Sequence, residues 1–301
     1  MKHFLSSEFP PAAADAARFH IIPAPMELSV SYGRGASQGP AAILEASQQL
    51  EAFDGRGTPG EAGIFTAPVI NPEPPSGENG HSCPFSLEKT TDRNVRSPLW
   101  LDAIERSVAS ALTCHALPIL LGGEHTVTLG AARAFHKAGR KIGFLHFDAH
   151  ADLRDEYEGS RFSHACVMRR VHELGFHLVQ IGTRAYSLEE HVYRLENAGK
   201  IRAHDACENI NVELLPVNFP QDVYVSFDVD AWDPSLMPAT GTPVPGGLTW
   251  WDPLRLIRSL VLQTGRRIVG ADVVELAPNP ALPHADFTAA RMVYALMGMM
   301  R

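Results

Sequence analysis

Carboxylates and imidazoles recur at short intervals in two segments of the chain. The segments GFLHFDAHAD and DVYVSFDVDAWD supply five such side chains at alternate positions: Asp148, His150 and Asp152 in the first, and Asp228 and Asp230 in the second. In an extended chain successive side chains point to opposite faces, so residues two apart share a face. Each segment is therefore predicted to direct its polar side chains toward one point.

A third segment, LGGEHTVTLG, adds His125 after a pair of glycines. Four buried carboxylates without compensation would cost several kcal/mol per group, so cations must accompany them. Oxygen and nitrogen ligands without a thiolate favour Mn²⁺ before Zn²⁺, and the imidazoles disfavour Mg²⁺. The six ligands exceed what one catalytic ion usually takes. Two ions about 3.5–4 Å apart would lower the pKa of a shared water from about 15.7 toward neutrality.

These segments must be positioned by the elements that precede them. Short apolar runs alternate with helical patterns along most of the chain, which is typical of βαβ units and a parallel sheet. The buried runs are His20–Ile22, Ala116–Leu121, Lys141–Phe147, Leu178–Ile181, Val223–Val229 and Arg267–Val274, and helical patterns cover Pro40–Phe53, Thr126–Ala138 and Pro253–Thr264. Parallel sheets gather their sites at the carboxyl ends of strands, so we expect the three polar segments to face one crevice.

The stretch from Gly55 to Pro98 differs in amino-acid composition from the rest of the chain. It mixes proline, glycine, serine and glutamate without a sustained period, as in INPEPPSGENGHSCPF. We interpret it as a long surface excursion within one domain that spans residues 1–301.

Composition excludes several classes of protein. The chain has 301 residues and a formal net charge of −8, with 34 acidic against 26 basic side chains, and no basic patch suited to nucleic acid. No apolar stretch approaches the roughly 20 residues of a membrane-spanning helix, and no secretory signal is evident. The four cysteines form no C-x-x-C pair, which favours a reduced, cytoplasmic location over disulfides or thiolate zinc.

Four ordered motifs give the chain a specific resemblance. GGEHT, FDAHADLR, SFDVDAWDPSLMPATGTPVPGGLT and GADVVELAP resemble those of the ureohydrolase family, the arginases and agmatinases, and YGRGASQGPAAI resembles that family's N-terminal stretch. The resemblance covers most of the chain from about His20 onward, apart from the excursion. It implies a three-layer α/β/α fold with a central, mostly parallel sheet, and hydrolysis of a guanidino compound to urea and an amine.

The same resemblance assigns roles to individual residues. It implies a dinuclear manganese site held by His125, Asp148, His150, Asp152, Asp228 and Asp230, the set that the strand ends already suggest. It further implies that His164 is a proton shuttle, that Glu275 binds the guanidinium, and that Thr242 lines the substrate pocket. Asp152 would also relay a proton to the amine leaving group. We expect His146 to face core packing and Asp272 to support the sheet end.

Agmatine is the predicted substrate. The segment DLRDEYEGSRFSHA resembles the agmatinases, and the acidic residues of this loop, Glu158 above all, would stabilise the substrate's far ammonium group. Asp155 and Glu156 are expected to be solvated surface charges. The resemblance to this family also implies that the protein forms a homotrimer or homohexamer.

Alternatives remain open. The substrate could be arginine, guanidinobutyrate, formiminoglutamate or aminopropylagmatine. A substrate with a carboxylate would need a cationic side chain to bind it, such as Arg154 or Arg161. A catalytically silent paralogue that acts as scaffold or sensor is a second possibility, although it would have no need for four buried carboxylates. A deacetylase of related architecture would show the ligands of one metal ion only.

Overall fold

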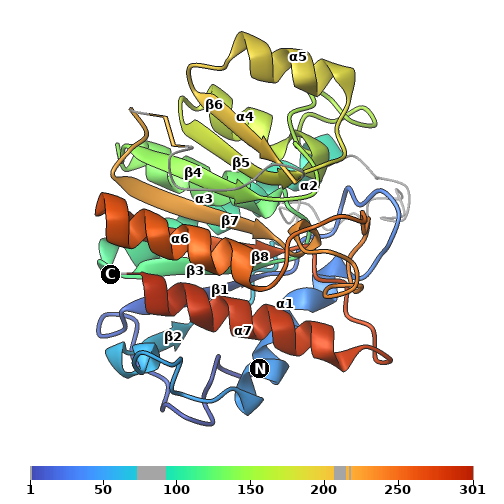
Figure 1. Cartoon of the computed structure of the whole chain (residues 1–301). Helices are drawn as coiled ribbons and strands as arrows, with labels where there is room; N and C mark the ends of the chain where they lie inside the picture. Colours follow the sequence, from blue (N-terminus) through green and yellow to red (C-terminus); the bar gives the residue numbers. More distant parts are fainter. Residues whose placement is uncertain (1, 73–92, 207–214, 217, 301) are drawn as a thin grey trace, which may run out of the picture.

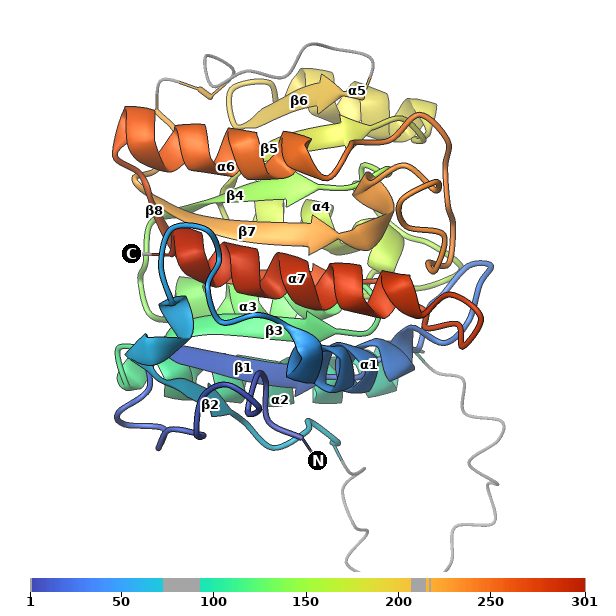
Figure 2. The ribbon, with the colours of Figure 1, turned by 60° about the horizontal axis from the view of Figure 1, so that its bottom comes forward.

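The structure of the protein, a computed structural model, describes residues 2–72, 93–206, 215–216 and 218–300. One eight-stranded sheet lies between two layers of helices, and its described strands all pair in parallel (Figures 1 and 2). The strands are β1 Phe19–Ala24, β2 Ile64–Thr66, β3 Leu117–Gly122, β4 Ile142–Phe147, β5 His177–Thr183, β6 Ile201–Asp205, β7 Asp222–Asp228 and β8 Arg267–Val274. This architecture confirms the predicted α/β/α fold.

Each face of the sheet is covered by its own set of helices. One face carries α1 Gly39–Ala46, α6 Trp251–Thr264 and α7 Pro283–Met299, and the other carries α2 Arg93–Thr113, α3 Val127–Lys137 and α4 Val167–Glu173 (Figure 2). The strands supply both cores because their side chains alternate: Phe147 of β4 packs on the first face and Phe144 on the second. Near-continuous burial along the central strands explains why their sequences are mostly apolar. No helix in the described ranges is both long enough and apolar enough to cross a membrane.

The strand order places the polar segments together. Across the sheet the order is β2-β1-β3-β8-β7-β4-β5-β6, so β3 and β4, which are consecutive in the chain, are separated by β8 and β7. The carboxyl ends of β3, β8, β7 and β4 are therefore neighbours at the point where the order changes. A parallel sheet opens a crevice at such a point.

The first predicted helix is too long. The structure ends α1 at Ala46 and continues with a single 3₁₀ turn, Ser47–Gln49, after which Leu50 is extended. The Ser47 hydroxyl donates to the carbonyl of Leu44 and accepts from the amide of Leu5. Serine competes in this way with backbone hydrogen bonds and so terminates helices that apolar spacing alone would extend.

The loop predicted from Gly55 to Pro98 is wrong at both ends. Strand β2 lies inside it and pairs with β1 through Ile64–Thr66, and α2 begins at Arg93 and continues through Pro98. A three-residue strand is too short to show a period, and a proline near a helix start resembles a boundary. Residues 73–92 of the predicted excursion lie outside the described residues.

Candidate metal centre

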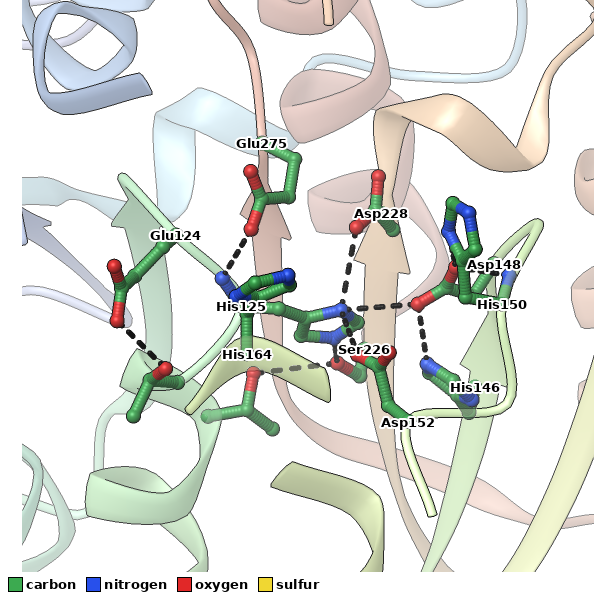
Figure 3. A network of polar contacts seen from close by, with 12 residues as sticks. Glu124, His125, His146, Asp148, His150, Asp152, His164, Ser226, Asp228 and Glu275 are labelled. Atoms are coloured by element: carbon green, nitrogen blue, oxygen red, sulfur yellow. Dashed lines mark hydrogen bonds and ion pairs between the residues drawn. The ribbon is translucent and has the colours of Figure 1, made fainter. Parts of the chain in front are cut away.

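Six side chains converge where β3, β4 and β7 end, as predicted, and we call this set the candidate metal centre: His125, Asp148, His150, Asp152, Asp228 and Asp230. Figure 3 labels all of them except Asp230. The reason for the convergence differs in part from the prediction. Strand β4 ends at Phe147 and β7 at Asp228, so four of the six side chains come from the turns that follow these strands. Asp152 reaches the centre through a positive φ of 54°.

The first half of the centre surrounds His125. Its Nδ1 atom lies 3.0 Å from Asp148 Oδ2, 3.3 Å from Asp152 Oδ2 and 3.2 Å from Asp228 Oδ2. All four side chains are buried. Three carboxylate oxygens thus face one imidazole nitrogen.

The second half surrounds His150. Its Nδ1 atom lies 3.0 Å from Asp230 Oδ2 and 3.4 Å from Asp148 Oδ1. Asp148 therefore turns one oxygen toward each half. A carboxylate shared in this way is suited to bridging two ions.

Hydrogen bonds behind His125 fix which ring nitrogen carries the proton. His125 Nε2 lies 2.9 Å from Ser226 Oγ, and that hydroxyl donates to Asp272 Oδ1 at 2.9 Å. Because Ser226 uses its only proton on Asp272, it accepts from the N–H of His125. The neutral ring therefore directs its Nδ1 lone pair toward the oxygens of three carboxylates. His125 Nδ1 has no hydrogen-bond partner among the described residues. A cation ligated by these four groups resolves that conflict, so the residues present fit a metal ion. The expected supporting role of Asp272 agrees with these contacts.

The electrostatics of the site also call for positive charge. Burial raises the pKa of Asp228 and Asp230, and the negative charge of Asp148 raises both further. Burial and Asp148 likewise raise the pKa of Asp152 to about 7. Burial alone would lower the pKa of His125, but its contacts with the surrounding carboxylates raise it well above its usual value. Divalent cations would meet this demand without protonating the ligands.

Glu275 follows β8 and is placed next to the centre by close backbone packing. Its amide donates to the carbonyl of Gly123, and its Oε1 accepts from the amide of His125 at 2.7 Å. Gly123 is needed here because a Cβ atom would lie 2.1 Å from the carbonyl oxygen of Met26. Glu275 itself has a positive φ of 64°, a strained conformation typical of functional positions. Burial and the charge of Glu124 raise its pKa to about 8.

Two adjoining cavities open at the centre. The inner one, about 20 Å³, is bounded by five of the six side chains of the centre, all except Asp148, by Glu275, and by residues 30–33, of which Tyr32 and Gly33 belong to the N-terminal motif. The outer one measures about 390 Å³. His164 and Thr242 line both cavities. Glu158 is exposed and does not belong to the described lining of either cavity.

His164 is held between two serines. Its Nδ1 lies 3.1 Å from Ser29 Oγ and its Nε2 lies 2.9 Å from Ser31 Oγ. Ser29 donates in turn to Glu124, which also accepts from Thr126. These bonds orient the imidazole at the boundary of the two cavities.

The expectation that His146 faces core packing is wrong. His146 is fully buried, and its Nε2 lies 2.9 Å from Asp148 Oδ2. The alternation in HFD already signals this, because His146 is two residues before Asp148 and so shares its face. Ser226 was not predicted to belong to the site, because a single serine in a buried strand has no pattern that distinguishes it.

The parallel sheet and the carboxylate–imidazole cluster at its carboxyl edge define an α/β protein with a candidate metal centre. The chain belongs to the arginase family, whose profile matches residues 17–299.

Relatives of known name support this assignment. The N(1)-aminopropylagmatine ureohydrolase of Synechocystis is 35% identical over 308 residues, covering 99% of this chain and 93% of the relative. The agmatinase of Pyrococcus horikoshii is 31% identical over 299 residues, covering 97% and 95%. The crystal structure of the agmatine ureohydrolase of Thermoplasma volcanium has a TM-score of 0.77 and 26% identity, covering 99% of this chain and 94% of that one.

Proposed function

We propose that the protein is a manganese-dependent ureohydrolase that converts agmatine to putrescine and urea. The observation that carries the proposal is Asp148, which shares its two oxygens between two imidazole–carboxylate clusters beside Glu275. Imidazole and carboxylate ligands without a thiolate favour Mn²⁺ over Mg²⁺. Two such ions would supply Lewis-acid charge and lower the pKa of a water toward neutrality.

Glu275 binds and orients the guanidinium group in this proposal. One carboxylate oxygen is anchored by the amide of His125, which holds the side chain toward the inner cavity. A planar guanidinium offers paired N–H donors that match a carboxylate, so the group is held in one orientation with its carbon facing the centre. The cationic substrate also stabilises the ionised form of Glu275 against burial.

Asp152 and His164 move protons. Asp152 lines both the inner and the outer cavity, and in this proposal its carboxylate relays a proton from the centre to the leaving amine. His164 lies at the same boundary, and the hydroxyls of Ser29 and Ser31 hold its ring so that it can pass a proton from the solvent side. Thr242 also lines both cavities.

The outer cavity accommodates the rest of the substrate. Its volume of about 390 Å³ suits the four-carbon chain of agmatine and leaves room for an aminopropyl extension, the substrate named for the Synechocystis relative. We also propose that Glu158 binds the terminal ammonium group of the substrate. Asp155 is instead paired with Arg161 and Arg170, as expected of a surface charge.

One observation favours a second candidate substrate, a guanidino acid. Arg154 lines the outer cavity and lies over the ring of Tyr157. The described residues give it no acidic partner, whereas Arg161 and Arg170 are paired with Asp155. A carboxylate at the end of the substrate would complete the pairing of Arg154.

Urea release from a panel of substrates tests the proposal. Agmatine, aminopropylagmatine, guanidinobutyrate and arginine are incubated side by side with protein reconstituted with Mn²⁺. We expect agmatine to be turned over and arginine not to be. Preference for guanidinobutyrate, abolished by Arg154→Gln, would establish the second candidate, whereas no release from any substrate would favour a silent paralogue.

The proposal also covers the cellular location and the oligomeric state of the enzyme. We propose a cytoplasmic homotrimer or homohexamer. Light scattering coupled to size exclusion distinguishes these assemblies from a monomer of 32.8 kDa.

A further inference from the structure

A continuous line of buried hydrogen bonds leads away from the candidate metal centre through β5 to the outer helix α5, Leu188–Glu196. His146 Nε2 lies 2.9 Å from Asp148 Oδ2, and His146 Nδ1 lies 3.0 Å from Gln180 Nε2. Gln180 Oε1 accepts from Arg194 Nε at 2.9 Å, and Arg194 Nη1 donates to Asp205 Oδ1 at 3.2 Å. His146 and Gln180 are fully buried, and Arg194 is 7% exposed.

Two independent contacts determine the orientation of the Gln180 amide. Arg194 offers only donors, so the atom that faces it must be the amide oxygen. On the other side, Gln180 Nε2 lies 2.6 Å from the carbonyl oxygen of Ala151, which offers only an acceptor. Both contacts require the same orientation.

This orientation in turn fixes the tautomer of His146. The Gln180 amide group donates to His146 Nδ1, which must therefore carry a lone pair. The proton of the neutral ring is then on Nε2 and points at Asp148 Oδ2. His146 belongs to a group of side chains close enough to share an ion, yet with Nε2 protonated it offers that ion no lone pair. It is a donor to a ligand instead.

We propose that the line Asp205–Arg194–Gln180–His146 positions Asp148, the carboxylate shared by the two halves of the centre, so that both halves bind their ions. The inference rests on the proposed metal-dependent function. His146 is a positioning residue, since it acts through Asp148 alone. Its bond holds Asp148 Oδ2 toward His125, while the amide of His150 donates to Oδ1 at 2.6 Å. With both oxygens held by hydrogen bonds, the carboxylate keeps one oxygen toward each half of the centre.

The line also reaches the wall of the outer cavity. Tyr186 lines that cavity, its hydroxyl donates to Asp205 Oδ2 at 2.7 Å, and Arg194 lies over its ring. The side of the cavity that receives the substrate's tail is thus built on the same residues that orient Asp148.

The test is Mn²⁺ binding, measured by calorimetric titration of protein stripped of metal with a chelator. We expect His146→Leu to weaken binding by about 10- to 100-fold, the usual effect of losing a partner of a metal ligand. His146→Gln, whose amide can again donate to Asp148, should recover most of the affinity. Gln180→Met should weaken binding in the same direction without touching His146 or any ligand.

Thr183→Val is the matched control. Thr183 is fully buried on the same strand as Gln180, and its hydroxyl has no hydrogen-bond partner within the described residues. This variant should bind Mn²⁺ like the wild type. Should His146→Leu fail to fold, Arg194→Lys tests the outer end, because one ammonium cannot reproduce the fork that joins Gln180 to Asp205.

The outcomes separate the inference from the function beneath it. Wild-type protein that binds no Mn²⁺ would overturn the proposed function. Wild-type protein that binds Mn²⁺, together with folded His146→Leu and Gln180→Met variants of equal affinity, would overturn the positioning role alone. A lower melting temperature without a change in Mn²⁺ affinity would identify the line as purely structural, which also contradicts the inference.

Discussion

Replacing Ser226 with alanine removes the hydroxyl that fixes the ring of His125. In the wild type this hydroxyl accepts from His125 Nε2 and donates to Asp272, each at 2.9 Å. Asp272 keeps two other donors in the variant, the hydroxyl of Thr128 and the amide of Phe227. The imidazole therefore loses the one hydrogen-bond partner that the described residues give it on that side, and its Nδ1 lone pair is no longer held toward the carboxylates.

Two magnitudes follow. A buried N–H left without an acceptor costs about 1–3 kcal/mol of folding free energy. Loss of a partner behind a metal-binding histidine lowers metal affinity by about 10- to 100-fold, or about 1.4–2.7 kcal/mol. Both effects should appear in Ser226→Ala, and only the second one is specific to a metal centre.

Calorimetric titration with Mn²⁺ and chemical unfolding of the metal-free protein measure the two effects separately. Ser47→Ala is the control, because Ser47 is also fully buried and its hydroxyl also joins a donor to an acceptor, the amide of Leu5 and the carbonyl of Leu44, but it belongs to the N-terminal region. It should lose stability and keep its Mn²⁺ affinity. Equal Mn²⁺ affinity of folded Ser226→Ala and wild type would refute the reasoning about His125.

Three further substitutions test other parts of the account. Glu275→Gln removes a charged acceptor worth about 1.5–3 kcal/mol, so kcat/KM for agmatine should fall by about 10- to 150-fold in urea-release assays while bound Mn²⁺ is retained. His164→Asn should lower kcat by about 10²- to 10⁴-fold, and an unchanged kcat would exclude the proton shuttle. Gly123→Ala places a methyl group 2.1 Å from the carbonyl oxygen of Met26 and should lower the melting temperature; a stable variant would contradict the close packing that positions Glu275.

The fold was predictable where the strands are long and buried. Runs such as Lys141–Phe147 and Val223–Val229 mark β4 and β7 within one or two residues because burial on both faces makes most of their positions apolar. Strand β2 was not predictable, since three edge residues show no period. The end of α1 depends on the Ser47 hydroxyl, whose partner Leu5 lies far away in the chain.

The candidate metal centre was predictable in its residues and less so in its geometry. The spacing of Asp148, His150 and Asp152 identifies them as a set, although turns beyond the strand bring them together. Their supporting partners were not predictable from sequence. Gln180 is 34 residues from His146 and meets it only because β4 and β5 are neighbours in the sheet.

Urea release from agmatine by metal-stripped protein, measured before and after reconstitution with Mn²⁺, shows whether the six-residue centre is a catalytic metal site. We expect no urea from the stripped protein, restored release after Mn²⁺ is added, and no restoration in folded Asp230→Asn. Equal urea release with and without metal, or wild-type release by Asp230→Asn, would contradict this expectation.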